Sequence, residues 1–181
     1  MTNEEFESAL DLVVKGNKEG LKIIYDAYIR LIYAVVIDTV GHREDAEDIT
    51  SEFFIKLIRV AGSFKKGSPH KAWLVTIAKN MAIDAIRKNK REIPVEQAEA
   101  DYSSVEHDSP VESQTVLAED MRKAMSKLSQ KEREIIDMKL LGELKFREIA
   151  MVTKQPMGTV TWLYNQGIKK LRRCLSGYER E

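Results

Sequence analysis

Apolar residues recur every three or four positions along most of this chain, and the helical spacing is lost in only one long stretch, residues 92–114. The periodic segments predict eight helices, over residues 4–15, 18–40, 43–60, 70–90, 115–127, 131–142, 146–152 and 157–175. Gly and Pro are scarce, at 9 and 4 of 181 residues, and no strand-like alternation is sustained. We therefore predict an all-α protein, in which two small helical domains, residues 1–91 and 115–181, are joined by a flexible acidic linker.

The net charge is zero, because 29 Lys and Arg balance 29 Asp and Glu, but the two signs are separated along the chain. Residues 1–61 carry 12 acids and 7 bases, whereas residues 62–91 carry 8 bases and the single acid Asp84. Residues 92–114 carry 7 acids and no Lys or Arg, and residues 149–178 carry 5 bases and no acid. Separate basic segments on a neutral chain indicate local contact with a polyanion.

The sequence lacks the signatures of several classes of enzyme and metal site. The three histidines, His42, His70 and His107, are too widely spaced for a metal site, and the single cysteine, Cys174, allows no intrachain disulfide. No phosphate-binding glycine loop, nucleophile elbow or zinc-protease motif is present. We therefore expect no catalytic residue, cofactor, metal or small-molecule substrate. The acidic N-terminus and the lack of an apolar run of about 20 residues predict a cytoplasmic protein without membrane insertion.

The last predicted helix has two different faces. One face, expected in the core, carries the apolar residues Val160, Tyr164, Ile168, Leu171 and Leu175. The other face combines hydroxyl, aromatic, amide and cationic side chains: Thr161, Trp162, Asn165, Gln166, Lys169, Arg172 and Arg173. Amides can read base edges and cations can bind phosphates, while Thr159 could help to present backbone N–H groups to a phosphate. A short helix precedes this one, and Pro156 prevents it from continuing through the turn. A short helix, a break and a longer helix with a polar face form the helix-turn-helix pattern. The alternative is a small helical bundle whose last helix is only solvated.

A second basic surface is predicted between residues 64 and 88. The helix over residues 70–90 places on or near its outer half Thr76, Lys79, Asn80, Ile83, Asp84, Arg87 and Lys88. The preceding loop, GSFKKGSPHK, adds Phe64, Lys65, Lys66, His70 and Lys71. A loop with cations, an aromatic ring and small residues can accept an unstacked base while neutralising the backbone. We expect His70 at the helix start or on a phosphate, and Trp73 in the core in preference to a stacking role.

The helix over residues 43–60 carries one apolar side chain outside its core stripe. The expected core stripe is Ala46, Ile49, Phe53, Phe54, Leu57 and Val60. The opposite face has Ile55 near its centre, among Asp48, Glu52, Lys56 and Arg59. Such a face is either a small protein contact site or a solvated helix with one stray apolar residue.

Motifs in three segments resemble bacterial RNA polymerase sigma factors of the sigma-70 family. In LSQKEREIIDMKLLGELKFREIAMVTKQPMGTVTWLYNQGIKKLRR, residues 128–173, the features that resemble the family's C-terminal DNA-binding region are Leu128-Ser129, Glu132-Arg133-Glu134, Glu148-Ile149-Ala150, Pro156 with Gly158-Thr159-Val160, and Lys169-Lys170-Leu171. DAEDITSEFFIKLIRVAGSF, from Asp45, resembles the polymerase-binding helix, and KAWLVTIAKNMAIDAIRKNKR, from Lys71, resembles the promoter-melting helix. With no middle domain between the two modules, the layout resembles the extracytoplasmic-function (ECF, group 4) type.

The resemblance implies a promoter-specificity subunit with no catalytic activity of its own. Residues 1–91 would bind the clamp of core RNA polymerase and the melted minus-ten promoter element. Residues 115–181 would read the minus-thirty-five element and contact the polymerase flap, and the linker would lie near the RNA path. An anti-sigma factor, which holds many relatives inactive, is a further candidate partner.

The same resemblance implies three sets of contact residues. Those for polymerase are Asp45, Asp48, Glu52, Ile55, Lys56 and Arg59. Those for minus-ten DNA are Phe64, Lys65, Lys66, His70, Lys71, Thr76, Lys79, Asn80, Asp84, Arg87 and Lys88. Those for minus-thirty-five DNA are Met157, Thr159, Thr161, Trp162, Asn165, Gln166, Lys169, Lys170 and Arg173.

Some positions depart from the family pattern. Lys154 stands where the turn commonly has Gly, and Lys145 stands where a Ser N-cap is usual. Thr161, Trp162 and Leu163 replace a segment that is usually basic and polar, which implies weaker phosphate binding and a shallower salt dependence. Trp162 would face a thymine methyl, a sugar or a partner protein.

Two other functions stay open at this point. One is a stand-alone helix-turn-helix regulator that binds duplex DNA as a dimer. The other is a protein-interaction module with a degenerate DNA-binding domain, in which a partner buries the face that carries Trp162 and Leu163.

Overall fold

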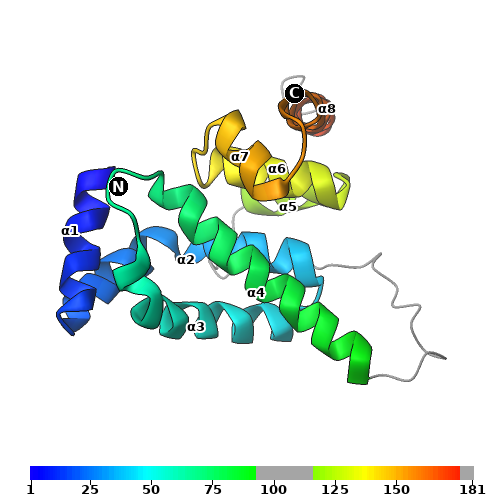
Figure 1. Ribbon diagram of the computed structural model, residues 1–181. Helices are drawn as coiled ribbons and strands as arrows, with labels where there is room; N and C mark the ends of the chain where they lie inside the picture. The colour runs from blue at the N-terminus through cyan, green and yellow to red at the C-terminus, as the bar shows by residue number, and fades with distance from the viewer. Residues whose placement is uncertain (93–115, 176–181) are drawn as a thin grey trace. The chain divides into compact units, whose positions relative to one another are not determined.

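The computed structural model describes residues 1–92 and 116–175, which are helical apart from short connections (Figure 1). The elements are α1 (Asn3–Val14), α2 (Lys18–Val40), α3 (Arg43–Val60), the 3-10 turn η1 (Ala61–Ser63), α4 (His70–Glu92), α5 (Val116–Ser126), α6 (Gln130–Leu140), α7 (Phe146–Thr153) and α8 (Met157–Leu175). The residues described contain no strand, so the predicted all-α class is confirmed. The helix bounds agree with the predicted ones to within two residues.

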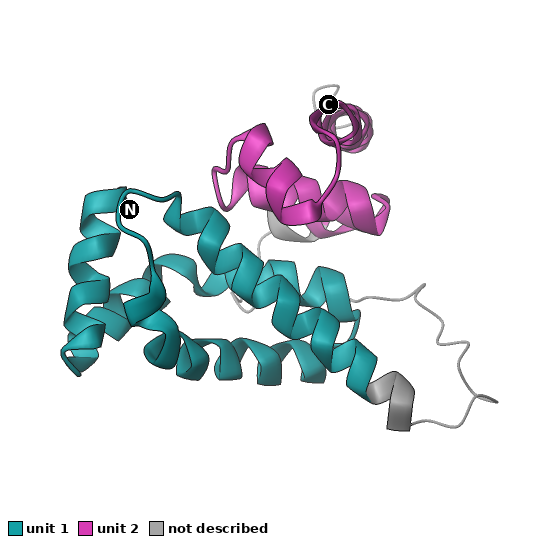
Figure 2. Ribbon diagram, viewed as in Figure 1, with its two compact units in different colours: residues 1–100 teal, residues 101–181 magenta. Residues whose placement is uncertain are grey.

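The chain divides into two compact units, residues 1–100 (unit 1) and 101–181 (unit 2) (Figure 2). Each unit has its own helices and its own core, and the two are considered separately below. The predicted linker, residues 92–114, lies outside the described residues except for Glu92.

Helix α2 is the central helix of unit 1 and contacts α1, α3 and α4. Its middle, residues 31–37, reads LIYAVVI, and every one of these residues is buried. A surface helix has one apolar stripe, whereas a helix that is covered on several sides is apolar around its circumference. The composition of this segment therefore follows from the three helices that surround it.

Helix α1 lies very close to the first turn of α2, at Gly20. A Cβ atom added to Gly20 would lie 2.3 Å from the carbonyl oxygen of Ala9 and 2.7 Å from the Cβ of Leu12. Both atoms belong to the backbone of α1 or to the base of a side chain, so neither can move without displacing the helix. Glycine at this position is what permits the close packing.

Helix α8 is the central helix of unit 2 and contacts α5, α6 and α7. The buried cluster consists of Ala124, Leu128, Ile136 and Leu171, with the half-buried Met125, Tyr164, Ile168, Cys174 and Leu175 packed against it. Gly167 allows α8 to approach α6, because a Cβ atom there would lie 2.5 Å from the Cδ1 of Ile136. Leu163 is also buried, at 9% exposed. The prediction that it shares an outward face with Trp162 is therefore wrong.

In the turn between α7 and α8, Lys154 stands where the family commonly has Gly, and its backbone has the positive φ that a Gly position suggests. Lys154 has φ 54° and ψ 35°, in the left-handed region, where a side chain is strained by about 1 kcal/mol. Glu143, which was not predicted, has φ 53°. At the start of α7 the Lys145 side chain provides no cap; instead the Glu148 carboxylate accepts a hydrogen bond from the backbone N–H of Lys145 at 2.8 Å.

Candidate nucleic-acid interface

The outer surface of α8 changes in character along the helix. Residues 157–168 include no Lys, Arg, Asp or Glu. Met157 and Trp162 are 57% and 59% exposed, and Thr159 and Asn165 are also exposed. The cations follow in the last two turns, where Lys169, Arg172 and Arg173 are exposed. The helix therefore presents apolar and amide groups first and positive charge afterwards.

One stripe of α8 brings together four of the predicted contact residues. Trp162, Asn165, Gln166 and Lys169 are separated by three, four and seven positions, so they share one face of the helix. Trp162, Asn165 and Lys169 are exposed, and Gln166 is half-buried. We call this set the α8 stripe.

Thr161 lies beside the α8 stripe, and its hydroxyl is already engaged. The Thr161 Oγ1 donates to the backbone carbonyl of Met157 at 2.9 Å. Such back-bonding to the preceding turn is common for Thr in helices. With its proton committed, Thr161 can still accept a hydrogen bond from a base edge.

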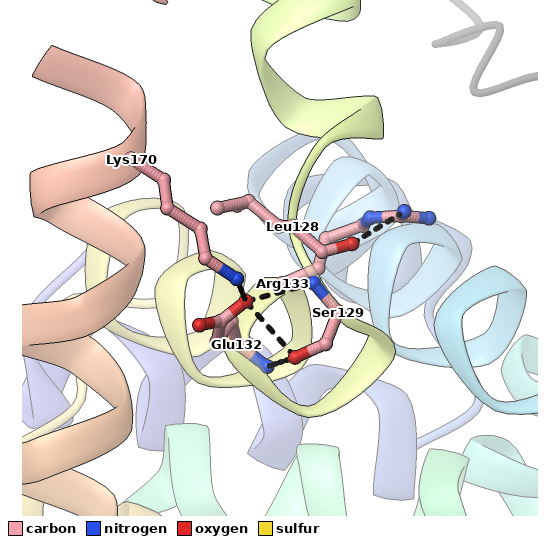
Figure 3. Close-up of polar contacts among 5 residues, drawn as sticks. All are labelled: Leu128, Ser129, Glu132, Arg133 and Lys170. Carbon is pink, nitrogen blue, oxygen red and sulfur yellow. Dashed lines mark hydrogen bonds and ion pairs between the residues drawn. The ribbon is translucent and has the colours of Figure 1, made fainter. Parts of the chain in front are cut away.

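Lys170 has a structural role that the sequence did not reveal. Its Nζ donates to Glu132 Oε2 on α6 at 2.7 Å, and the Glu132 side chain is only 6% exposed (Figure 3). The same carboxylate oxygen accepts from the backbone N–H of Ser129 at 2.8 Å and from the Ser129 hydroxyl at 2.9 Å. Lys170 therefore binds α6, and because its side chain is 43% exposed the minus-thirty-five contact stays a prediction.

The pKa of the Glu132 carboxyl reflects these contacts. Burial acts to raise the pKa, but the hydrogen bonds from Lys170 and Ser129 outweigh burial and lower it below its ordinary value of 4.5. Glu132 is therefore ionised at neutral pH, and it fixes α8 to the N-terminus of α6.

In unit 1, His70 contradicts the prediction of a phosphate contact. It begins α4, as expected, but it is only 3% exposed and its ring stacks on Phe6 at 4.6 Å. Its two ring nitrogens are hydrogen-bonded to the Tyr28 hydroxyl and to the side-chain oxygen of Asn3. Burial, followed by the charge of Lys71, lowers the pKa of His70 to about 4, so the ring is neutral at pH 7. A buried neutral imidazole is not available to a phosphate.

Phe64 also faces the core of unit 1 and is half-buried. Its ring meets those of Trp73 and Phe6 edge-on, with centroid distances of 5.0 and 5.3 Å. Trp73 is half-buried in the same cluster, in line with the core role expected for it. Phe64 thus packs within unit 1, and its base-stacking role stays a prediction. We call Phe6, Phe64, His70 and Trp73 the aromatic cluster.

The cations of the loop before α4 are only partly available. Lys66 donates to Asp11 on α1 at 2.7 Å, and this hydrogen bond raises the pKa of Lys66. The backbone N–H of Gly67 donates to Glu7, also on α1, at 2.7 Å. Lys65 is exposed. The loop is thus held against α1 by two acidic side chains.

The outer face of α4 keeps most of its predicted contact residues accessible. Thr76, Asn80, Asp84 and Lys88 are exposed at steps of four, which places them along one stripe. Arg87 is exposed and lies 3.6 Å from Asp84, in an ion pair that solvent screens. Lys71 and Lys79 are half-buried. This α4 stripe is a polar surface with cations at its C-terminal end.

The outer face of α3 has two apolar residues where the sequence reading identified one. Ile55 and Ile58 are 55% and 48% exposed. Asp48, Glu52, Lys56 and Arg59 are exposed around them, and Asp45 is half-buried. Ile58 was missed, although its spacing of three from Ile55 was a usable signal. We call Glu52, Ile55, Lys56, Ile58 and Arg59 the α3 face.

The described part of the chain offers neither a metal site nor a membrane span. No group of three His, Cys, Asp or Glu residues there is arranged to hold a metal ion. None of the helices described is long and apolar enough to cross a membrane.

Comparison with known proteins gives matches across both units. Residues 24–92 match the sigma-70 region 2 family. Over 173 residues the chain is 31% identical to the ECF RNA polymerase sigma factor SigW of Bacillus subtilis, with 90% of this chain and 92% of SigW covered. Over 165 residues it is 30% identical to the ECF RNA polymerase sigma factor BldN of Streptomyces coelicolor, with 88% of this chain and 62% of BldN covered.

Two solved structures share the fold. The sigma factor RpoE of Bartonella quintana, in complex with the anti-sigma factor NepR, aligns with a TM-score of 0.60 at 23% identity, covering 86% of this chain and 96% of that one. CnrH, in complex with the cytosolic domain of CnrY, aligns with a TM-score of 0.59 at 16% identity, covering 96% and 98%. At these identities the similarity concerns the fold alone.

Proposed function

Since this chain belongs to the ECF RNA polymerase sigma factors of the sigma-70 family, we propose that it binds core RNA polymerase and directs initiation at a specific set of promoters. The observation that carries the proposal is the 31% identity that extends over 92% of SigW, because it includes both units. This chain contributes recognition, and the polymerase performs the chemistry. Since polymerase and chromosomal DNA lie in the cytoplasm, we place the activity there.

The α3 face is our candidate for docking on the polymerase clamp. Its exposed pair Ile55 and Ile58 supplies an apolar centre, and Glu52, Lys56 and Arg59 supply a charged rim. Protein contact sites commonly combine a buried apolar centre with a polar rim. Two adjacent isoleucines make the contact-site reading stronger than a single stray residue would.

The α4 stripe is our candidate for holding the melted minus-ten element. Thr76 and Asn80 offer hydrogen-bonding groups to unpaired bases, and Arg87 and Lys88 offer charge to the backbone. Because His70 is buried in the aromatic cluster, base capture would depend on Phe64, Lys65 and polar groups of α4.

The α8 stripe is our candidate for reading the minus-thirty-five element as duplex DNA, through the major groove. The flap of polymerase is a second candidate contact of unit 2. Since the two units belong to one chain, the binding of either raises the effective concentration of the other at the promoter. RpoE was solved in complex with the anti-sigma factor NepR, and we propose that this chain also has an anti-sigma regulator.

Transcription with purified core polymerase on a pool of promoter fragments tests the proposal directly. We expect specific start sites that require this protein. Binding of duplex DNA by the pure protein as a dimer, without polymerase binding, would favour a stand-alone regulator instead. Stable polymerase binding without initiation would favour a protein-interaction module.

A further inference from the structure

The first three turns of α8 carry an unusual set of exposed groups for a helix that reads DNA. Trp162 is 59% exposed and Met157 is 57% exposed, and Asn165 and Gln166 follow Trp162 by three and four positions. No Lys or Arg occurs between residues 157 and 168. The cation nearest to the amides on the α8 stripe is Lys169, at the start of the basic segment.

The exposure of Trp162 is not a by-product of core packing. The next residue, Leu163, is buried, and Val160 is fully buried, so the core side of this turn is already filled. Thr161 is tied to the Met157 carbonyl. The indole therefore projects on the side that carries Asn165, Gln166 and Lys169. A large apolar side chain in that position gains free energy when a partner offers it apolar surface.

Base pairs differ in what they offer in the major groove. Arg and Lys read the O6 and N7 acceptors of guanine, Asn and Gln read adenine, and apolar side chains contact the 5-methyl group of thymine. The N-terminal residues of a recognition helix are those that reach base edges, and later residues meet the backbone. In α8 the early turns contain the groups that suit adenine and thymine and lack those that suit guanine.

We propose that Trp162 is a specificity-determining residue, which packs its indole on a thymine methyl group while Asn165 and Gln166 select adenine. The upstream element read by this protein is then defined by A·T pairs, and Lys169 holds the adjacent phosphate. This inference rests on the proposed function, because it assumes that α8 enters the major groove of a promoter.

Replacing thymine by deoxyuridine tests the inference, because it removes only the 5-methyl group and leaves base pairing intact. A promoter is first selected from the fragment pool with polymerase and this protein. Every thymine of its upstream element is then replaced, with the rest of the promoter unchanged. We expect about a fourfold loss of holoenzyme affinity for each methyl group that Trp162 contacts, corresponding to about 0.8 kcal/mol.

Three variants identify the residue responsible. Trp162→Ala should bind the two templates equally, at about the affinity of the native protein for the deoxyuridine template. Trp162→Phe should keep part of the preference for thymine, since it keeps an apolar ring. Lys169→Ala, the matched control on the same stripe, should weaken binding to both templates by one common factor and leave their ratio unchanged.

The outcomes separate this inference from the proposed function. If the native holoenzyme initiates specifically but does not distinguish thymine from deoxyuridine, the inference is wrong and the proposed function stands. The same holds if Trp162→Ala keeps the full discrimination, or if it weakens polymerase binding in the absence of DNA, which would identify a protein partner for this face. If no promoter is selected at all, both fail.

Discussion

The aromatic cluster of unit 1 and the α8 stripe of unit 2 both contain aromatic side chains, and the two units orient them in opposite ways. In unit 1 the rings of Phe64, in the loop before α4, and of His70, the first residue of α4, turn inward onto Phe6, and the loop is held against α1. In unit 2 Trp162 turns outward, and α8 is held by an ion pair beneath it. An aromatic residue beside cations is thus packed inside one unit and exposed on the surface of the other, where we propose that it contacts DNA.

The difference has a physical basis in how each ring is supported. In unit 1 Phe6 belongs to α1, and His70 and Trp73 belong to the first turn of α4, so these rings pack on one another between the two helices. A helix already buries one face, so a residue on the other face can remain exposed without loss of the core. Changes at the two sites should therefore separate stability from recognition.

The largest contrast is expected between removal of an inward ring and removal of an outward one. Phe6→Ala leaves a cavity among Phe64, His70 and Trp73 and should destabilise unit 1 by about 3–5 kcal/mol. Trp162→Ala should change the stability of unit 2 by about 0.5 kcal/mol or less, as for other exposed positions. Urea unfolding, followed by hydrogen exchange in each unit, measures both. Equal losses would remove the distinction between the two sites.

Acid should weaken unit 1 through His70. The folded state keeps His70 neutral, with a pKa of about 4, whereas the unfolded chain binds the proton near the ordinary value of 6.5. The contribution of neutral His70 to the unfolding free energy of unit 1 is fully present above pH 6.5. This contribution, about 3 kcal/mol in total, is lost as the pH falls towards 4. Unfolding free energies of unit 1 between pH 7 and 4 measure this slope.

His70→Gln provides the control for the acid effect. Glutamine keeps hydrogen-bonding groups near Tyr28 and Asn3 but does not titrate in this range. The variant should lose most of the slope between pH 6.5 and 4, whatever its stability at pH 7. A slope that persists unchanged would assign the acid effect to other groups.

An outward face of unit 1 can be tested in the same way as that of unit 2. Glu52→Arg together with Ile55→Asp should weaken polymerase binding by about tenfold or more, equivalent to roughly 1.4 kcal/mol, and leave unit 1 folded. A matched control is Glu4→Arg together with Val14→Asp, which makes the same chemical changes at two exposed positions of α1. Similar losses for the two variants would argue against the α3 face as the docking surface.

Loss of the ion pair beneath α8 should have a smaller effect. Lys170→Met leaves the buried Glu132 carboxylate with the Ser129 donors alone and should destabilise unit 2 by roughly 1–2 kcal/mol, since Lys170 is itself 43% exposed. The pair contributes stability above pH 4.5, and that contribution is lost as the pH falls through the lowered pKa of Glu132. Acid unfolding of unit 2, with and without the substitution, tests both statements.

The smallest expected change is a gain. Lys154→Gly relieves a side chain from the left-handed region and should stabilise unit 2 by up to about 1 kcal/mol. Lys154→Ala removes the same charge but keeps the strained backbone, so it should give no such gain. Thermal unfolding of both variants distinguishes conformation from charge.

Helical periodicity was enough to predict the eight helices, because it depends on residues three and four apart. It was also enough to place Val160 inside and Trp162 outside. It failed where orientation depends on a distant partner. His70 bonds to Tyr28 across 42 positions, and Lys170 bonds to Glu132 across 38, and no local pattern contains either pair. Leu163 was misplaced because a segment comparison with the family treated it as part of an outward run.

The contact residues themselves stay predictions. Those on the α3 face, the α4 stripe and the α8 stripe are exposed, apart from the half-buried Gln166. The structure contradicts the contact role of His70, which is buried, and it adds ring packing to Phe64 and an ion pair to Lys170.

The shielded position of the Glu132 carboxylate has a consequence for how this protein would respond to ionic strength. At 0.1 M salt, dissolved ions screen exposed charges that lie more than about 10 Å apart, but they act much less on a pair with one partner shielded from water. Added salt should therefore weaken the binding of unit 2 to a DNA phosphate backbone at concentrations at which the Lys170–Glu132 ion pair still holds α8 against α6. If α8 binds promoter DNA as proposed, a rise in salt concentration would release the DNA while unit 2 stays folded and able to bind again.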